Sequence, residues 1–269
     1  MVSALGSAPE PAPYAACSKL WIYTNYDCNL SCSYCCANSH PAAARRALGL
    51  GDVRRLVDEA VELGFSHVYF TGGEPFLLDE IYEMLAYASA RLTTSVLTNA
   101  MLLHGPRLAR LAAIANDRLR IQVSLDGATA ADHDAYRGRG SWARTIAGIR
   151  ALKAAGLHVC LSTTETPANA PRLGAIRELR RELGVAEADH FVRPLAQRGF
   201  SHAGLEVTML TIAPEVTASV DGIFWHPLST DPDMQVSKEL FPLAGAVARI
   251  NQQVETIQRT GVAPPLVFR

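Results

Sequence analysis

Lysine is scarce in this sequence, and so are other features that would mark a nucleic-acid-binding or membrane protein. Only three of the 25 basic residues are Lys, and the Arg residues are scattered rather than clustered. The net charge of −1 gives no bulk electrostatic reason to expect nucleic acid or a membrane surface as a partner. No apolar run is long enough to span a bilayer. We therefore expect neither kind of partner.

A secretory signal is also absent from the N-terminal residues 1–17, which have no basic segment followed by an apolar stretch. This segment is rich in Ala, Pro and Ser and is typical of a flexible leader. We expect the protein to be cytoplasmic, where thiols stay reduced. Four of the six Cys lie between positions 28 and 36, which indicates metal binding rather than a disulfide framework.

Strand-length apolar runs alternate with helical patterns from Lys19 to Leu195. Short connections predict parallel strands joined by right-handed crossovers, in an open doubly wound sheet or a partial barrel. In either fold, loops at the carboxyl ends of the strands carry the chemistry. The predicted strands are 20–23, 67–71, 94–98, 119–125, 158–163 and 189–195, and the predicted helices are 52–63, 79–90, 105–115, 141–155 and 171–183. Candidate helix caps are Asp52 and Ser141 at the start, and Gly64 and Gly156 at the end.

The pattern changes after Leu195. Segments 207–212, 216–220 and 223–226 are typical of short strands around the turn Asp221-Gly222. Residues 237–259 predict one long helix with Pro242 in its first turns. We therefore predict a core of residues 18–200 and a C-terminal appendage of residues 201–269, made of a β-hairpin and a helix.

The cysteine loop directly follows the first predicted strand. Cys28, Cys32 and Cys35 have the spacing C-x-x-x-C-x-x-C, which lets three thiolates converge from one loop. A structural zinc site prefers four ligands, commonly as paired C-x-x-C units, and no second pair exists here. A redox C-x-x-C motif needs only two cysteines, so it does not account for the third. Cys36 is either an additional ligand or a small buried apolar residue, Cys17 is unassigned, and Cys160 is expected in the core.

Three further motifs accompany this loop at predicted strand ends. They are Thr71-Gly72-Gly73-Glu74-Pro75, Ser124-Leu125-Asp126-Gly127 and Arg137-Gly138-Arg139-Gly140-Ser141. Together with the cysteine spacing, the set resembles the radical S-adenosylmethionine (radical SAM) superfamily, and within it the subgroup related to the SPASM/Twitch enzymes. The resemblance covers about Trp21 to Leu195 and implies a partial (β/α)6 barrel of parallel strands.

The resemblance implies a role for each matched residue. Cys28, Cys32 and Cys35 would ligate one [4Fe–4S] cluster and leave its fourth iron open to S-adenosylmethionine. Gly72 and Gly73 let the backbone approach that ligand, and the Glu74 carboxylate can accept from its ammonium group. The other implied S-adenosylmethionine contacts are Tyr34, Thr98, Asn99, Ser124, Asp126 and Arg137.

Other readings of these residues stay open. The glycine motif by itself is a plain turn, and Tyr34 can fill the core beneath the loop. Asp126 can form a local turn with Gly127. Arg137 can pair with the ligand's carboxylate or form a surface salt bridge. Where the family often has Gly after Asn99, this chain has Ala100.

The C-terminal part departs from the subgroup, because auxiliary clusters need several Cys and none follows Cys160. We therefore expect a degenerate remnant of the auxiliary domain. His202 and His226 stand near expected ligand positions, as metal ligands, substrate contacts or satisfied polar residues. Further substrate candidates are Glu165, Arg193 and Trp225, with His190 near a strand end.

The expected function is that of a radical S-adenosylmethionine enzyme. The reduced cluster would cleave S-adenosylmethionine to a 5′-deoxyadenosyl radical, which abstracts hydrogen from a small-molecule or peptide substrate in a biosynthetic pathway. The electron would come from a donor such as flavodoxin or ferredoxin. The alternative is a non-catalytic iron–sulfur electron carrier or sensor, against which the Gly72–Glu74 motif argues. A methyltransferase without a cluster leaves the cysteine loop unexplained.

Overall fold

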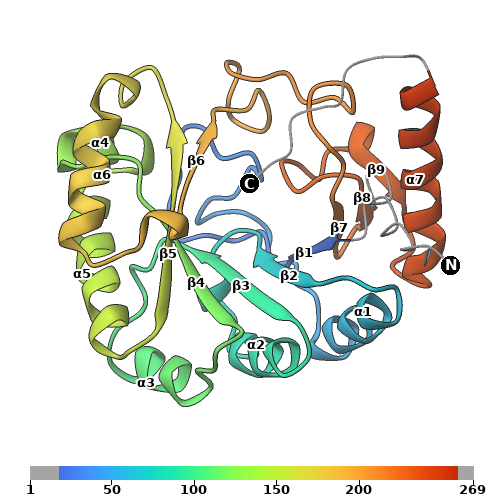
Figure 1. Ribbon diagram of the computed structural model, residues 1–269, viewed down its shortest axis with the longest axis horizontal. Coiled ribbons are helices and arrows are strands. Elements are labelled where there is room, and N and C mark those ends of the chain that lie inside the picture. The colour runs from blue at the N-terminus through green and yellow to red at the C-terminus, as the bar shows by residue number, and fades with distance from the viewer. Residues whose placement is uncertain (1–17, 260–269) are drawn as a thin grey trace, which may run out of the picture.

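The computed structural model describes residues 18–259 and contains a nine-stranded sheet that does not close (Figure 1). Its strand order is β6-β5-β4-β3-β2-β1-β7-β8-β9. The strands are β1 (Lys19–Tyr23), β2 (His67–Thr71), β3 (Thr93–Thr98), β4 (Leu119–Ser124), β5 (His158–Glu165), β6 (His190–Pro194), β7 (Val216–Ser219), β8 (Gly222–Phe224) and β9 (Gln235–Ser237). The expected leader of residues 1–17, with Cys17, lies outside the described residues, as do residues 260–269.

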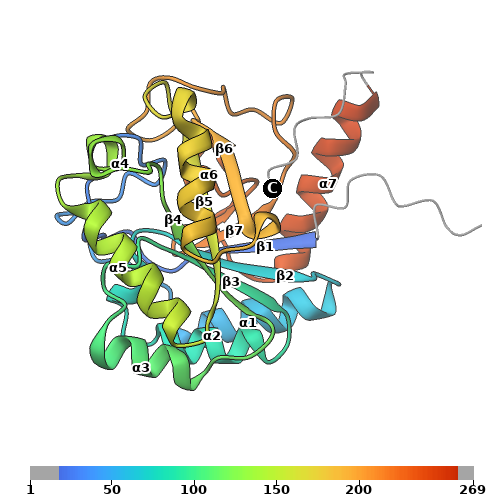
Figure 2. The same cartoon turned by 60° about the vertical axis from the view of Figure 1, so that its left-hand side comes forward.

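Strands β1 to β6 are all parallel and pair in sequence order, as in a partial (β/α)6 barrel. The helices are α1 (Leu50–Glu62), α2 (Ile81–Ser89), α3 (Gly105–Ala113), α4 (Ala130–Arg137), α5 (Ser141–Ala154), α6 (Leu173–Glu182) and α7 (Leu243–Arg259). Helices α1, α2, α3, α5 and α6 lie outside the curved sheet (Figures 1 and 2). The predicted α/β class and parallel partial barrel are confirmed.

Apolar periodicity explains why these helices cover the sheet. In α1, Val53, Leu56, Val57 and Ala60 recur at helical spacing, and all four are fully buried. Gly64 and Gly156 follow helices with φ of +81° and +75°, a backbone conformation that suits Gly. Both predicted helix ends are therefore confirmed.

Two predicted N-caps are wrong by a few residues. Helix α1 begins at Leu50 with Gly49 at the cap, so Asp52 lies in the first turn, where its charge suits the helix dipole. Helix α5 is capped by Gly140, and Ser141 is its first residue. Helix α4 was not expected, because only three of its eight residues are buried and its apolar pattern is weak.

The C-terminal part continues the main sheet. Strand β7 pairs in parallel with β1, and β8 and β9 add two antiparallel strands. The hairpin around Asp221-Gly222 is confirmed, although β8 ends at Phe224 rather than at residue 226. The predicted strand 207–212 is wrong: Val207 and Ile212 are buried, but a turn lies between them.

The C-terminal helix is shorter than predicted. Ser237 belongs to β9, and α7 begins at Leu243, after Pro242. The Leu243 N–H donates to Glu59 of α1 at 2.6 Å, which satisfies a backbone group at the start of α7. The core is continuous from the barrel into this region, since Phe224, Met234 and Leu243 belong to the same buried cluster as Leu20.

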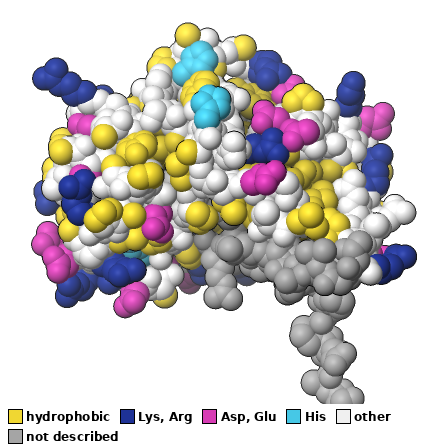
Figure 3. Space-filling view, turned by 90° about the horizontal axis from the view of Figure 1, so that it is seen from above, with side chains coloured by type: hydrophobic (Ala, Val, Ile, Leu, Met, Phe, Trp, Pro, Cys, Tyr) yellow, Lys and Arg dark blue, Asp and Glu magenta, His cyan; other side chains and the backbone are white. Residues whose placement is uncertain are grey.

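Two smaller expectations concern buried groups and membranes. Cys160 is 1% exposed, as expected for a core residue. Within residues 18–259, the structure has no helix with the length and apolar character needed to cross a bilayer. Seen from the side towards which β5 and β6 point, basic, acidic and apolar side chains are interspersed (Figure 3).

Candidate active site

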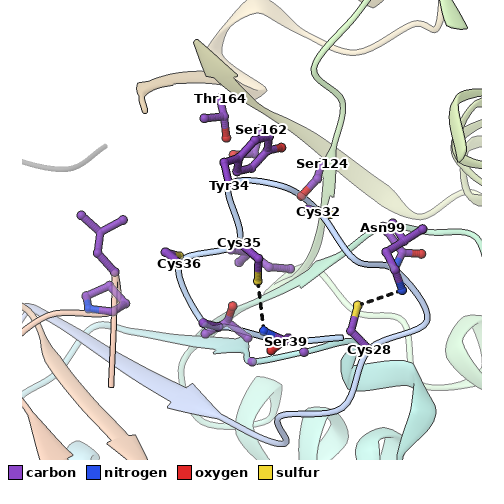
Figure 4. Close-up of a pocket in the computed structure, with 18 of the residues that line it drawn as sticks. Cys28, Cys32, Tyr34, Cys35, Cys36, Ser39, Asn99, Ser124, Ser162 and Thr164 are labelled. Carbon is purple, nitrogen blue, oxygen red and sulfur yellow. Dashed lines mark hydrogen bonds between the residues drawn. The ribbon is translucent and has the colours of Figure 1, made fainter. Parts of the chain in front are cut away.

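A cavity opens at the carboxyl ends of the parallel strands, between the loop after β1 and the ends of β1 to β6 (Figure 4). Most residues predicted for the cluster and the S-adenosylmethionine site line it. They are Cys28, Cys32, Tyr34, Cys35, Gly72, Gly73, Glu74, Thr98, Asn99, Ser124 and Arg137. The fold therefore brings together motifs that lie more than 100 residues apart in the chain.

Two backbone groups point at sulfur atoms of the cysteine loop. The Leu30 N–H donates to Cys28 Sγ and the Ser39 N–H donates to Cys35 Sγ, each at 3.4 Å (Figure 4). Such bonds favour the thiolate, the form that binds metal. Burial raises the pKa of the Cys28 thiol to about 12 and that of the Cys32 thiol to about 11. A metal must therefore displace a proton from each as it binds.

The loop after β6 packs against the backbone of the cysteine loop. Gly199 has φ of +60°, and a Cβ there would lie 2.2 Å from the Cys35 carbonyl oxygen. The Phe200 N–H donates to that same oxygen at 3.1 Å. Cys36 also lines the cavity, and burial raises its pKa to about 12. Sequence reasoning attached no role to Gly199, whose importance depends on a contact across the fold.

The glycines of the second motif allow two loops to meet. A Cβ on Gly72 would lie 2.3 Å from Asn25 O, and one on Gly73 would lie 1.9 Å from Asp27 O. The Gly73 and Glu74 N–H groups donate to those same carbonyls at 2.8 and 3.0 Å. These two N–H groups thus fasten the loop after β2 to the loop that carries the cysteines.

Glu74 lines the cavity with only 1% of its surface exposed. Its Oε1 accepts from the Thr98 hydroxyl at 2.7 Å and from the Phe76 N–H at 3.2 Å, and its Oε2 accepts from the Asn99 N–H at 2.9 Å. Burial raises the pKa of this carboxyl, although these donors lower it. Among the described contacts Oε2 has one donor, so it can accept another from a ligand.

Asn99 connects β3 to the cysteine loop, because its Nδ2 donates to Asn29 Oδ1 at 2.7 Å. Ala100, which stands where the family often has Gly, has φ of +60°. This positive φ is a conformation that favours Gly, which agrees with the Gly that the family often has at this position.

Asp126 lies behind the cavity wall rather than in its lining. It is fully buried and accepts from the Tyr34 hydroxyl, from Arg137 Nε and, at 2.7 Å, from the Thr164 N–H. Tyr34 and Arg137 both line the cavity, and Arg137 is 9% exposed. Asp126 and Arg137 therefore form a buried ion pair, and the Tyr34 hydroxyl joins the cysteine loop to Asp126 at the ends of β4 and β5.

The far wall of the cavity combines two hydroxyl groups that sequence reasoning did not single out with Arg193, a predicted substrate candidate. Ser162 and Thr164 of β5 line it near Ser124 (Figure 4). Arg193 of β6 lines it too, and its Nη1 donates to the Ser162 hydroxyl at 3.3 Å. The period-two alternation of β5 places Ser162 and Thr164 on one face, and this was the available signal.

The remaining substrate candidates lie elsewhere. Glu165 and His202 are exposed and absent from the cavity lining, while Trp225 lines a separate groove against α7. His226 is fully buried; its Nδ1 accepts from the Leu228 N–H at 3.2 Å, and burial lowers its pKa to about 3. The His190 ring is 2.9 Å from the Thr163 hydroxyl. Arg193 is thus the one substrate candidate in this cavity.

Comparison with known sequences agrees with this geometry. Residues 22–168 match the profile of the radical SAM superfamily. The AdoMet-dependent heme synthase of Oleidesulfovibrio alaskensis is 32% identical over 173 residues, which are 64% of this chain and 44% of the relative. Mycofactocin maturase MftC of Mycobacterium ulcerans is 36% identical over 135 residues, 49% of this chain and 35% of the relative. The chain spans less than half the length of these relatives.

Solved structures show the same fold over more of the chain. The crystal structure of Streptococcus suis SuiB bound to S-adenosylmethionine matches with a TM-score of 0.59 and 18% identity. The match covers 93% of this chain and 49% of SuiB. The shared fold therefore extends beyond residues 22–168 into the C-terminal strands.

Proposed function

Because the chain belongs to the radical SAM superfamily, we propose that Cys28, Cys32 and Cys35 hold one [4Fe–4S] cluster and that the cavity binds S-adenosylmethionine. The observation that carries this proposal is the convergence of three cysteines, the Gly72–Glu74 motif and Arg137 on one cavity. Three thiolates from one loop suit a cluster with an open iron. N–H bonds to two of the sulfurs support the same assignment.

When bound, the cluster supplies the electron that splits the sulfonium C–S bond of S-adenosylmethionine, which gives methionine and a 5′-deoxyadenosyl radical. The residues of this chain bind and orient the ligand and exclude water. We assign Glu74 Oε2 to the ligand's ammonium group and the Arg137 guanidinium to its carboxylate, both as charge-assisted bonds. Tyr34, Ser124, Thr98 and Asn99 surround the rest of the ligand, with Gly72 and Gly73 giving the backbone its close approach.

In this proposal Asp126 does not contact the ligand directly. Its buried carboxylate already accepts from Tyr34, Arg137 and the Thr164 N–H. It therefore positions Tyr34 and Arg137 rather than reaching the ribose itself.

The substrate is proposed to be a peptide or a small metabolite in a biosynthetic pathway, from which the radical abstracts hydrogen. The sequence relatives include enzymes named for heme synthesis and for mycofactocin maturation, and SuiB has been crystallised with its precursor peptide SuiA. Arg193 is the substrate candidate that the cavity supports. We propose that residues 201–269 are a remnant of an auxiliary domain that closes the site without a second cluster, and that flavodoxin or ferredoxin supplies the electron.

The deciding experiment is anaerobic reconstitution followed by addition of dithionite and S-adenosylmethionine, with 5′-deoxyadenosine measured by mass-coupled chromatography. The wild-type protein should form this product. Cys32→Ala should bind no cluster and form none, because two thiolates do not hold the cluster. The matched control is Cys160→Ala, which changes a cysteine outside the cavity and should keep activity.

A negative result separates the alternatives. Protein that holds a cluster but neither forms 5′-deoxyadenosine nor binds S-adenosylmethionine in a titration is an electron carrier or sensor. Cys32→Ala protein with full iron and full visible absorbance would show that the cysteine assignment is wrong.

A further inference from the structure

Three side chains with metal-binding atoms meet at the amino end of β5, the end opposite to the cysteine loop. His158 and Cys160 lie two residues apart and so point to the same face of the strand. Asp189 is the last residue of a short helical turn (Glu187–Asp189) that leads directly into β6. At about 3.3 Å per residue, Cys160 lies about 7 Å and His158 about 13 Å along the strand from the cavity residue Ser162, and none of the three residues lines the cavity. The group is therefore separate from the proposed active site.

Two of the three ligand-atom separations are already close to those of a tetrahedral metal site. His158 Nε2 is 3.0 Å and Cys160 Sγ is 3.5 Å from the same Asp189 oxygen, Oδ1. All three ligand atoms lie within 4.8 Å of one another, which no other such group does among the described residues. Standard zinc bond lengths place N and O about 3.4 Å apart, and S and O about 3.6 Å apart. The two contacts to Asp189 thus lie within about 0.4 Å of these values, and an ion also requires His158 Nε2 and Cys160 Sγ, which lie within 4.8 Å of each other, to be about 3.6 Å apart.

The donor set and its exposure indicate which ion fits. One thiolate, one imidazole and one carboxylate form a mixed set that suits zinc and not the hard cations magnesium or calcium. The His158 and Asp189 side chains are 41% and 21% exposed, whereas Cys160 is 1% exposed. Solvent can therefore deliver the ion and fill the fourth position with water. Burial and the neighbouring Asp189 carboxylate raise the pKa of the Cys160 thiol to about 12, which the charge of Arg120 offsets only in part, so the ion must displace a proton from Cys160 as it binds.

We propose that His158, Cys160 and Asp189 bind one zinc-type divalent ion at the floor of the barrel, independently of the iron–sulfur cluster. Strand β6 is the end strand of the described sheet and pairs with β5 alone. The ion links β5 to the residue immediately before β6. With three protein ligands and an open fourth position, the site differs from a four-ligand structural zinc and lets the ion exchange with solvent. While bound, the ion fixes the edge strand that carries Arg193 to the cavity wall.

The test uses cluster-loaded protein, so that the cysteine loop is already filled with iron. The protein is mixed anaerobically with one equivalent of zinc and gel-filtered, and both metals are counted by mass spectrometry. We expect about one zinc per chain in the wild type. Zinc at 100 times its dissociation constant should also raise the unfolding temperature by about 5 °C.

Single variants locate the ion. His158→Gln and Cys160→Ala should lose the zinc and the thermal shift while keeping full iron, with zinc affinity at least tenfold weaker. His104→Gln changes another exposed histidine and should keep both. Cys32→Ala, in which no cluster forms, should still keep one zinc that His158→Gln removes. Zinc binding by this cluster-free variant tests the zinc site whether or not the proposed function is correct. Zinc below one tenth per chain in the wild type, or zinc retained by His158→Gln, would overturn the proposal.

Discussion

Glu74 is both a structural acceptor between strands and the proposed acceptor for the ammonium group of S-adenosylmethionine. Its carboxylate joins β2 to β3 through Thr98 and the Asn99 N–H. Glu74→Ala would remove the acceptor between the strands and the acceptor for the ligand together, and it would leave buried donors unsatisfied. A substitution that keeps the shape and removes the charge is therefore the sharper test.

Glu74→Gln should keep the cluster and weaken S-adenosylmethionine binding about tenfold or more, because a charge-assisted hydrogen bond contributes roughly 1.5–3 kcal/mol. Titration of the reconstituted protein with S-adenosylmethionine measures the change. The control is Glu80→Gln, an exposed acidic residue just before α2 without a side-chain cap bond. Equal affinities in Glu74→Gln and wild type would show that the motif is only a turn.

Tyr34, Asp126 and Arg137 show what the sequence could and could not predict for single residues. Each was predicted to face S-adenosylmethionine, on the strength of its motif. The structure places all three at this site but joins them to each other, since Asp126 accepts from both partners. Tyr34 and Asp126 are 92 residues apart in sequence, so no local pattern reports their contact.

At the level of elements, prediction succeeded where strand-length apolar runs alternate with helical patterns. Strands β1 to β6 and the helices α1, α2, α3, α5 and α6 arise from this alternation, although β1 is buried on both faces. The C-terminal part does not follow this alternation. Val207 and Ile212 are buried on either side of a turn, and β9 has three residues, too few to show a period.

Gly199 gives a prediction about how the loop after β6 shapes the cysteine loop. Gly199→Ala should lower the iron content of reconstituted protein by more than half, because its Cβ would lie 2.2 Å from the Cys35 carbonyl oxygen. The control is Gly156→Ala, which has a similar positive φ of +75° but no atom within 4 Å of the added Cβ. That change should cost about 1 kcal/mol of stability and no iron.

Iron analysis with visible absorbance compares the two glycine variants directly. Gly199→Ala protein with the same iron content as Gly156→Ala would show that the loop after β6 only covers the cysteine loop. A loss of iron in both variants would instead indicate that positive-φ strain, and not the contact, is responsible.

For the whole molecule, the arrangement of the sheet explains how the C-terminal residues take part in the site. Strand β7 extends the barrel sheet beside β1, and Pro227 and Leu228 after β8 reach the cavity lining. The C-terminal part thus shares both the sheet and the cavity with the core. Its contribution to the cavity consists of apolar side chains and backbone, with no cysteine.

This composition predicts a single cluster in the whole chain. Protein reconstituted with excess iron and sulfide, then desalted, should hold about four irons, since the cysteines beyond the loop are isolated in sequence. Combined replacement of Cys28, Cys32 and Cys35 by Ala should remove nearly all of this iron, while Cys160→Ala should remove none. A reproducible content near eight irons, half of it retained by the triple variant, would show that a second cluster exists and that the C-terminal part is not a cluster-free remnant.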